Sequence, residues 1–483
     1  MTTRVLFPFL TWRNGFRSRI GLLAVGLLGL AWRVQAQSFA PLSTYYCAGV
    51  TPRSVALGDV NGDGQLDVVT ANVGSNNVGV LLGQPSGFAA GNAFFTGASA
   101  PASGVALGDV NDDGRLDLVT VHNGANTVGV LLGQVGGFAA ITYYALGAAD
   151  HPYGLALGDV NGDGRLDIVT ANFGSSNVSV LLGQASGFAA AATYDTGAGS
   201  SPNGVALGDV DGDGRLDIVT ANNGTYSIGV LLGQRSGFAP VSRYASVGIP
   251  LGVALGDVNG DGHLDIVATT QNVTGGGVVG VLLGQTSGVF ADATTYPTGG
   301  QAGPPASVAL GDVNGDKRLD IVSANFDTHG VGVLLGLATG LFAPVTTYYF
   351  GASSLPNSIA LGDLNGDGKL DIVAADQGTS QVDVLRSQTG ALSAASMQAL
   401  APTLLLYPTP AHEQVTLQVA AGLGAPTQAE LLNLVGQVVR QPVLVPVGSG
   451  FRVEMAGLAA GIYTLRLHLG DKVVAQRVIL AGD

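Results

Sequence analysis

The sequence predicts an all-β protein, a seven-bladed β-propeller followed by a small Ig-like β-sandwich. An acidic, glycine-bearing nonapeptide recurs seven times at intervals of about 50 residues. Each interval holds four short apolar runs separated by turn residues, which is typical of a propeller blade. Glycine is abundant at 75 residues and charged residues make up only 11%, a composition that favours a turn-rich β fold over a disordered chain.

The first 36 residues have the pattern of an export signal. Four arginines between residues 4 and 19 precede an apolar run from Ile20 to Trp32. Val34-Gln35-Ala36 resembles a small-x-small cleavage site, which would leave Gln37 as the new terminus. The apolar run is too short for a comfortable transmembrane helix. We therefore expect residues 1–36 to be a signal peptide and the mature chain to be secreted, with no membrane span.

The unit around residues 188–233 illustrates the repeat. It predicts strands at 188–194, 204–208, 216–220 and 228–233, with turns between them. The apolar runs are continuous rather than alternating, as expected for sheets that are buried on both faces. Glycines within the strands allow close packing near a crowded axis.

The two ends of the repeat array predict how the ring closes. The last unit runs out after Leu385, whereas the first begins with a lone strand at 39–46. We expect this first strand to complete the last sheet and so remove an open edge. Seven units begin with a phenylalanine: Phe39, Phe88, Phe138, Phe188, Phe238, Phe290 and Phe342.

The nonapeptide has the chemistry of a calcium loop. In the third copy, Asp159 to Asp167, side-chain oxygens stand at positions 1, 3, 5 and 9, and a glycine allows a sharp turn at position 6. Position 7 varies among the copies, as expected of a residue that offers only its backbone carbonyl. The predicted side-chain ligands are Asp59, Asn61, Asp63, Asp67, Asp109, Asn111, Asp113, Asp117, Asp159, Asn161, Asp163, Asp167, Asp209, Asp211, Asp213, Asp217, Asp257, Asn259, Asp261, Asp265, Asp312, Asn314, Asp316, Asp320, Asp363, Asn365, Asp367 and Asp371. The predicted carbonyl ligands are Gln65, Arg115, Arg165, Arg215, His263, Arg318 and Lys369.

The sequence therefore predicts up to seven Ca²⁺ ions with unequal affinities. Lys317 replaces the position-6 glycine in the sixth loop, 312–320, so we expect the weakest affinity there. Asp211 adds a charge to the fourth loop, which should be among the tightest. The alternative is a set of Asx-rich hairpin turns without metal. The loops do not match EF-hands, because position 12 of the first four is Thr70, Thr120, Thr170 or Thr220 rather than a bidentate glutamate.

These repeats resemble the FG-GAP/VCBS family. The resemblance lies in Phe, then Gly-x-x-Pro, then Val-Ala-Leu-Gly-Asp-Val-Asn-Gly-Asp-Gly-x-Leu-Asp-Ile-Val, and it covers roughly residues 38–395. It implies an integrin-α-like seven-bladed propeller whose Ca²⁺ loops join adjacent strands and share one face. It also implies a role in adhesion or ligand recognition, and some members of the family are lectins or modules of secreted enzymes.

A different domain follows a linker at 396–403. Alternating patterns predict strands at 415–419, 429–434, 451–455, 462–469 and 473–480, and hence a small β-sandwich. Residues 404–483 resemble the type A C-terminal sorting domain of type IX secretion substrates, through Leu-Tyr-Pro-x-Pro, Gly-Ile-Tyr-Thr-Leu-Arg-Leu and Gln-Arg-Val-Ile-Leu. The family usually has asparagine where Thr409 stands. The resemblance implies handling by the type IX machinery of a Gram-negative bacterium, and then removal of the domain or attachment to the outer cell surface. The alternative is an ordinary Ig-like adhesive domain.

Charge and residue types limit the function. A formal charge of −14 argues against nucleic-acid partners. The propeller has no glutamate, its non-loop aspartates suggest no carboxylate pair, and its histidines suggest surface turns, so we expect no enzyme activity and no catalytic residues. We expect Cys47 to be a small buried hydrophobe.

The remaining prediction is an adhesion or recognition module for an extracellular protein or glycan. A lectin is the main alternative, and a polysaccharide-degrading enzyme a weaker one. A lectin would use the recurring tyrosines, which we interpret first as sheet-packing aromatics: Tyr46, Tyr144, Tyr194, Tyr244, Tyr296 and Tyr348. The segments expected to set specificity form one equivalent set of turns: Asn72–Asn77, His122–Asn126, Asn172–Asn177, Asn222–Ser227, Gln271–Gly277, Asn325–Gly330 and Asp376–Gln381.

Overall fold

The structure, a computed structural model, divides into two compact units, residues 1–388 and 389–483. It describes residues 38–97, 101–147, 151–272, 275–301, 303–388, 404–407, 414–419, 428–432, 438–447, 450–455, 457–458, 461–469 and 472–480. The predicted signal peptide and the predicted linker at 396–403 lie outside these residues. Within them, no helix is long and apolar enough to span a membrane.

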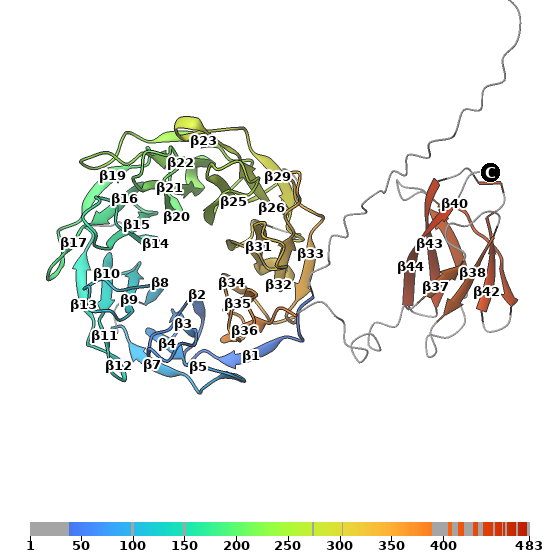
Figure 1. Ribbon diagram of the computed structural model, residues 1–483, viewed down its shortest axis with the longest axis horizontal. Helices are drawn as coiled ribbons and strands as arrows, with labels where there is room; N and C mark the ends of the chain where they lie inside the picture. The colour runs from blue at the N-terminus through green and yellow to red at the C-terminus, as the bar shows by residue number, and fades with distance from the viewer. Residues whose placement is uncertain are drawn as a thin grey trace, which may run out of the picture. The chain divides into compact units, whose positions relative to one another are not determined.

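The first unit is a ring of seven four-stranded antiparallel sheets, which confirms the all-β propeller (Figure 1). Blades 1 to 4 contain, from the inside outward, β2 (Pro52–Gly58), β3 (Asp67–Asn72), β4 (Asn77–Leu81) and β7 (Asn92–Phe95); β8 (Ala102–Gly108), β9 (Asp117–His122), β10 (Thr127–Leu131) and β13 (Thr142–Ala145); β14 (Pro152–Gly158), β15 (Asp167–Asn172), β16 (Asn177–Leu181) and β19 (Ala192–Asp195); and β20 (Pro202–Gly208), β21 (Asp217–Asn222), β22 (Ser227–Leu231) and β23 (Ser242–Ala245). Blades 5 to 7 contain β24 (Val253–Gly256), β25 (Asp265–Gln271), β26 (Gly277–Leu282) and β29 (Thr294–Pro297); β30 (Ser307–Gly311), β31 (Asp320–Asn325), β32 (Gly330–Leu334) and β33 (Thr346–Tyr349); and β34 (Pro356–Gly362), β35 (Asp371–Asp376), β36 (Gln381–Leu385) and β1 (Ser43–Tyr46).

Small elements connect these strands. The predicted single strand 188–194 is wrong, because it is broken into β18 (Gly187–Phe188) and β19. Phe188 pairs with Gly183 of β17 (Gly183–Gln184) in a separate hairpin, so the chain must leave that hairpin before it joins the blade. The equivalent hairpins are β5 (Gly83–Gln84) with β6 (Gly87–Phe88), β11 (Gly133–Gln134) with β12 (Gly137–Phe138), and β27 (Gly284–Gln285) with β28 (Val289–Phe290). Short 3-10 helices are η1 (Asn223–Thr225), η2 (Thr286–Gly288) and η3 (Phe326–Thr328).

The ring closes with the N-terminal strand, as predicted. β1 pairs antiparallel with β36, with Ser43 opposite Val384 and Tyr46 opposite Gln381. An isolated bridge between Phe39 and Ser387 extends the pairing. The outer edge of blade 7 is therefore supplied by residues more than 300 positions away in the sequence, and the closure ties the two ends of the repeat array together.

The core lies between neighbouring blades. The second strand of each blade is buried along its length, as in β3 and β15, except at Gln271, the last residue of β25. In β9, Val119 and Val121 pack toward Ile168 and Leu181 of blade 3. Burial of both strand faces explains why the apolar runs are continuous.

Aromatic pairs join the blades near their outer strands. Tyr194 lies edge-on to Phe238, with ring centroids 5.0 Å apart. Such edge-to-face pairs contribute about 0.5–1.5 kcal/mol beyond their buried area. The ring is completed by six more pairs: Phe39–Tyr348, Tyr45–Phe88, Phe94–Phe138, Tyr144–Phe188, Tyr244–Phe290 and Tyr296–Phe342.

Antiparallel pairing gives each blade two different ends. Gly58 pairs with Asp67, so the acidic nonapeptides lie at one end, which we name the loop face. Pro52 pairs with Asn72, so the turns after the second strands lie at the other end beside the start of the inner strands. We name this end the turn face. The segments predicted to set specificity all belong to the turn face.

The second unit contains two four-stranded antiparallel sheets. One has the order β37 (Leu404–Tyr407), β38 (Gln414–Val419), β42 (Gly450–Glu454) and β41 (Leu444–Val447). The other has the order β40 (Val438–Arg440), β39 (Gln428–Leu432), β43 (Gly461–Leu469) and β44 (Lys472–Leu480). Leu417, Leu431, Val453 and Leu465 bury their side chains in its core. The sequence patterns located the five longest strands here but not β37, β40 or β41.

Candidate functional site

Each nonapeptide folds around its first aspartate. In the first loop, Oδ1 of Asp59 accepts backbone N–H bonds from Gly62 and Asp63, and Oδ2 accepts one from Gly64 at 2.7 Å. Gly64 has a φ of +85°, which explains the glycine at position 6. The same bond from position 6 to position 1 occurs in all seven loops, at 2.6 to 2.8 Å.

The ninth position attaches the loop to the blade. Oδ2 of Asp67 accepts the N–H of Val60 at 2.8 Å, and Oδ1 accepts the N–H of Gly83 at 2.7 Å. The side chain is fully buried. All seven loops repeat both bonds. A carboxylate oxygen has two lone pairs, so each of these atoms can accept an N–H and still contact a cation.

Electrostatics of the loops favour a cation. Burial, together with the nearby carboxylates of Asp211 and Asp209, raises the pKa of Asp217 to about 6. Burial and neighbouring carboxylates likewise raise the pKa of Asp320 to about 7. The position-9 pKa is raised in each of the other five loops as well. A buried carboxylate among like charges is stabilised when a divalent ion neutralises it.

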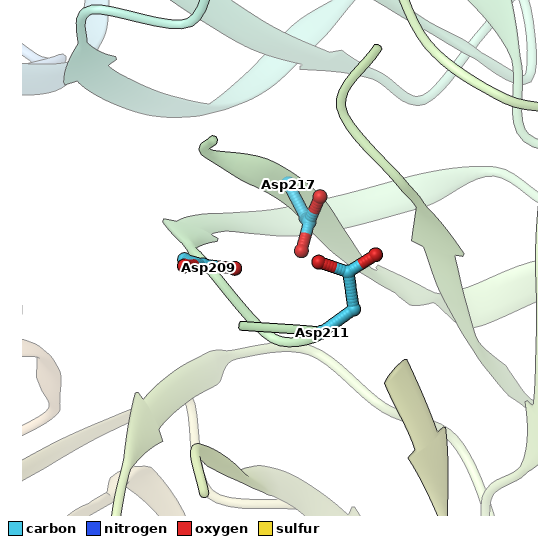
Figure 2. A group of neighbouring side chains, drawn as sticks. All are labelled: Asp209, Asp211 and Asp217. Carbon is cyan, nitrogen blue, oxygen red and sulfur yellow. The ribbon is translucent and has the colours of Figure 1, made fainter. Parts of the chain in front are cut away.

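The fourth loop brings three carboxylates together. Oxygen atoms of Asp209, Asp211 and Asp217 all lie within 4.8 Å of one another (Figure 2). One cation with bonds of roughly 2.3–2.6 Å can contact oxygens at that separation. The donor set is all oxygen, which suits Ca²⁺. In the other loops an asparagine amide oxygen replaces the middle carboxylate.

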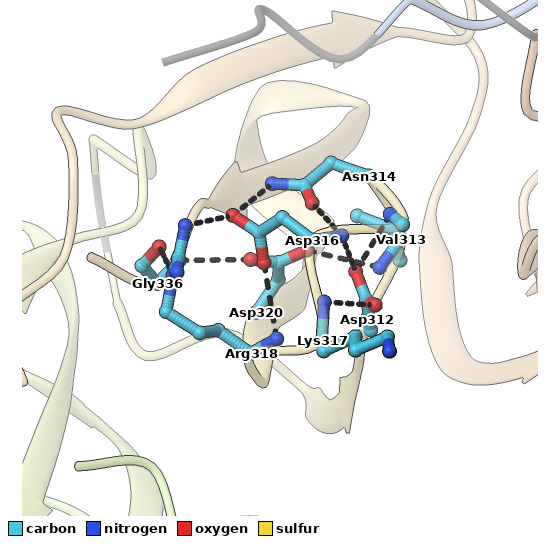
Figure 3. A network of polar contacts seen from close by, with 9 residues as sticks. Asp312, Val313, Asn314, Asp316, Lys317, Arg318, Asp320 and Gly336 are labelled. Atoms are coloured by element: carbon cyan, nitrogen blue, oxygen red, sulfur yellow. Dashed lines mark hydrogen bonds and ion pairs between the residues drawn. The ribbon is translucent and has the colours of Figure 1, made fainter. Parts of the chain in front are cut away.

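The sixth loop carries cations of its own (Figure 3). Lys317 has a φ of +68° at the glycine position, yet its N–H still reaches Oδ2 of Asp312 at 2.6 Å. Nη2 of Arg318 lies 2.6 Å from Oδ2 of Asp316, and Nε donates to the carbonyl of Gly336. The corresponding arginines of loops two and four are 3.8 and 3.5 Å from their aspartates. Among these three loops, the distance between the arginine and the predicted aspartate ligand is therefore shortest in loop six.

Two expectations about non-loop residues are wrong. Asp376 and Asp383, in adjacent strands of blade 7, form a hydrogen-bonded carboxyl pair that is 1% and 2% exposed. Since the pair is closed off from solvent, it does not offer a substrate site. His122 is fully buried in β9 beside Thr120, and not on a surface turn.

The tyrosines mostly pack between blades, as interpreted. Tyr144, Tyr194, Tyr244 and Tyr296 each contact a phenylalanine of the next blade. Tyr46 is the exception, because Tyr45 occupies the equivalent place and Tyr46 is 63% exposed. Cys47 is buried as expected.

Sequence reasoning missed the central channel. A cavity of about 230 Å³ is lined by the starts of the inner strands on the turn face, including Arg53, Tyr153, Asn203 and Asn357. The guanidinium of Arg53 lies 4.5 Å from the ring centroid of Tyr153. A signal was present in the sequence, because the residue after the recurring proline differs among otherwise similar repeats.

Comparisons with known proteins agree with this geometry. Two similar solved structures are crystal structures of BBS1N in complex with ARL6DN, one soaked with mercury and one with lead, with TM-scores of 0.50 and 0.52. They are 11% and 12% identical, and each match covers 74% of this chain and 98% of the other. At such identity the likeness concerns the fold alone. None of the curated proteins matches the chain.

Family comparisons identify both parts of the chain. The secretion system C-terminal sorting domain matches residues 405–481, which indicates export through the type IX system to the outside or the surface of the cell. The FG-GAP-like repeat matches residues 59–120, 109–170, 159–220, 213–268, 257–323 and 312–374. These matches span more than half of the sequence, and the chain belongs to the FG-GAP-like repeat family.

Proposed function

We propose that this exported propeller is a calcium-stabilised recognition module that binds an extracellular macromolecule or glycan through its turn face. The observation that carries the proposal is the distribution of sequence differences among the blades. The loop face repeats almost the same nonapeptide seven times, whereas the turn-face segments differ from blade to blade. A surface that varies within a regular scaffold is suited to recognition.

Calcium has a structural role in this proposal. The candidate ligands are held by backbone N–H groups and lie at the opposite end of each blade from the variable turns. At about 1 mM Ca²⁺ and a Kd of about 10⁻⁴ M, each site would add about 1.4 kcal/mol to the free energy of unfolding. The sum over six such sites approaches the free energy of unfolding of an average domain.

One experiment tests both parts. The purified chain is analysed for calcium, and its melting temperature is measured with calcium and with EDTA. Retention of extracellular polysaccharides and surface proteins on the immobilised chain is then measured under both conditions. We expect six to seven calcium ions per chain and a much lower melting temperature in EDTA. The immobilised chain should retain extracellular material only when calcium is present. A calcium-free chain with an unchanged melting temperature would overturn the calcium role, and no retention of any material would overturn recognition.

A further inference from the structure

The mouth of the central channel is the place where the inner strands differ most. Five inner strands begin with a bulge that shifts their register against the second strand, as between Pro52 and Ser54. The bulged residue is Arg53, Ser103, Tyr153, Asn203 or Asn357. These side chains line the cavity, so five nearly identical repeats present four different kinds of side chain there.

Arg53 reaches across this mouth. It belongs to blade 1, but it stacks over Tyr153 of blade 3, past Ser103 of the blade between them. Tyr153 is in turn supported edge-on by Phe173, with centroids 5.5 Å apart. The stacked arrangement holds the guanidinium plane in place while its N–H groups keep their donor capacity.

The cavity has one charge and many neutral polar groups. Arg53 is the single charged residue of its lining, and among the described residues no carboxylate lies within ion-pair distance of it. Ser54 accepts the N–H of Val105, and Ser358 accepts that of Val55, so each hydroxyl can donate its own hydrogen. Asn203 and Asn357 add amides that both donate and accept.

We infer that the channel mouth binds a carboxylated sugar, a uronic-acid unit of an extracellular polysaccharide. Arg53 would pair with the carboxylate in the bidentate geometry that arginine favours. The surrounding hydroxyl and amide groups would bond to the sugar hydroxyls. A volume of about 230 Å³ is below the usual range of about 300–1,000 Å³ for drug-sized ligands, which suits a single sugar ring. An aspartate or glutamate side chain of a protein partner would use Arg53 but leave the neutral groups without partners. The inference rests on the proposed recognition function and specifies its ligand.

The test uses tetramers of galacturonate, glucuronate and mannuronate, and their methyl esters, which keep the shape without the charge. Binding to the calcium-loaded full chain is measured by calorimetry. We expect at least one acidic tetramer to bind, with its ester and the variant Arg53→Gln each weakening binding at least ten-fold. Arg53→Lys should recover part of the loss. Arg235→Gln, at an exposed position on a loop-face hairpin, should bind as the parent does.

The alternative outcomes are distinct. Failure of all three acidic tetramers to bind, or equal binding of an acid and its ester, overturns the inference. Equal binding by the parent and Arg53→Gln also overturns the channel as the site, while recognition itself stands. If a hexaglutamate peptide binds through Arg53 and no tetramer does, the channel takes a protein ligand instead. If the immobilised chain retains no material in the broader binding experiment, by contrast, both the recognition function and this inference are overturned.

Discussion

Nη2 of Arg318 lies 2.6 Å from Oδ2 of Asp316, so the sixth loop already holds a cation on one of its predicted calcium ligands. Lys317 adds a second positively charged residue to the loop, at the position that is glycine in the other six loops. A bound Ca²⁺ would have to displace the guanidinium from Asp316. The lysine at position 6 and the short ion pair of Arg318 distinguish this loop from the other six.

The first prediction concerns the number of calcium ions. The parent chain should bind six Ca²⁺ ions in the millimolar range or tighter, and the double variant Lys317→Gly/Arg318→Gln should bind seven, because it restores glycine and frees Asp316. Equilibrium dialysis gives the stoichiometry. Arg115→Gln in loop two is the matched control and should leave the number unchanged, since that pair is 3.8 Å apart. Seven equivalent sites in the parent would contradict the prediction.

The second prediction concerns pH. Burial and the adjacent carboxylate of Asp376 raise the pKa of Asp383 to about 8. Between about pH 4 and pH 8 the unfolded chain loses this proton while the folded chain keeps it, so the group's contribution to stability falls as the pH rises through that window. Asp383→Asn should therefore stabilise the chain at pH 7, by at most about 4 kcal/mol, and should have little effect at pH 4.

Unfolding in guanidinium at saturating calcium, at pH 4 and pH 7, measures this difference. Asp195→Asn is the control, because Asp195 is exposed and an asparagine keeps the oxygen that accepts the N–H of Gly197. The same stability difference between parent and Asp383→Asn at both pH values would show that the proton is not held.

The third prediction concerns ring closure. Phe39→Ala removes the edge-on contact with Tyr348, whose ring centroid is 4.9 Å away, and should cost about 2–4 kcal/mol. Tyr46→Ala, in the same closing segment but at a side chain that is 63% exposed, should change stability by less than about 0.5 kcal/mol. Thermal melts measure both. A chain that begins at Val50 lacks β1, so β36 becomes an open edge, and copies of this chain should associate with one another. Equal losses for Phe39→Ala and Tyr46→Ala would be inconsistent with the closure.

The sequence predicted what repeats and missed what depends on register. Seven copies of one nonapeptide were enough to locate the loops, and the lone strand before Cys47 was enough to infer the closure. Asp376 and Asp383 meet because β35 pairs Asp376 with Gln381, which puts Asp383 on the diagonal of the same sheet face. Arg53 points into the channel because of a bulge after Pro52. Neither pairing register nor bulge position follows from hydrophobic pattern alone.

The fourth prediction tests how the blades contact one another near the axis. Each inner strand ends in a glycine, and a Cβ at Gly362 would lie 2.8 Å from Cδ1 of both Leu57 and Leu66 of blade 1. Leu66 is the position-8 leucine of its loop, so this contact links the loop face to the packing of the ring. Gly362→Ala forces both leucines to shift in a close-packed interface and should cost about 1–3 kcal/mol.

Gly124→Ala is the control, because a Cβ there meets no atom within 4 Å. Gly158 makes the same contact in blade 3, where Cδ1 of Leu216 would be 2.8 Å away. Since the two sites share no partner, the losses from Gly158→Ala and Gly362→Ala should add to within about 0.5 kcal/mol in the double variant. Denaturant unfolding measures all four variants. A Gly362→Ala chain as stable as the Gly124→Ala chain would mean that the leucines have room to move, and that the glycine is needed for another reason.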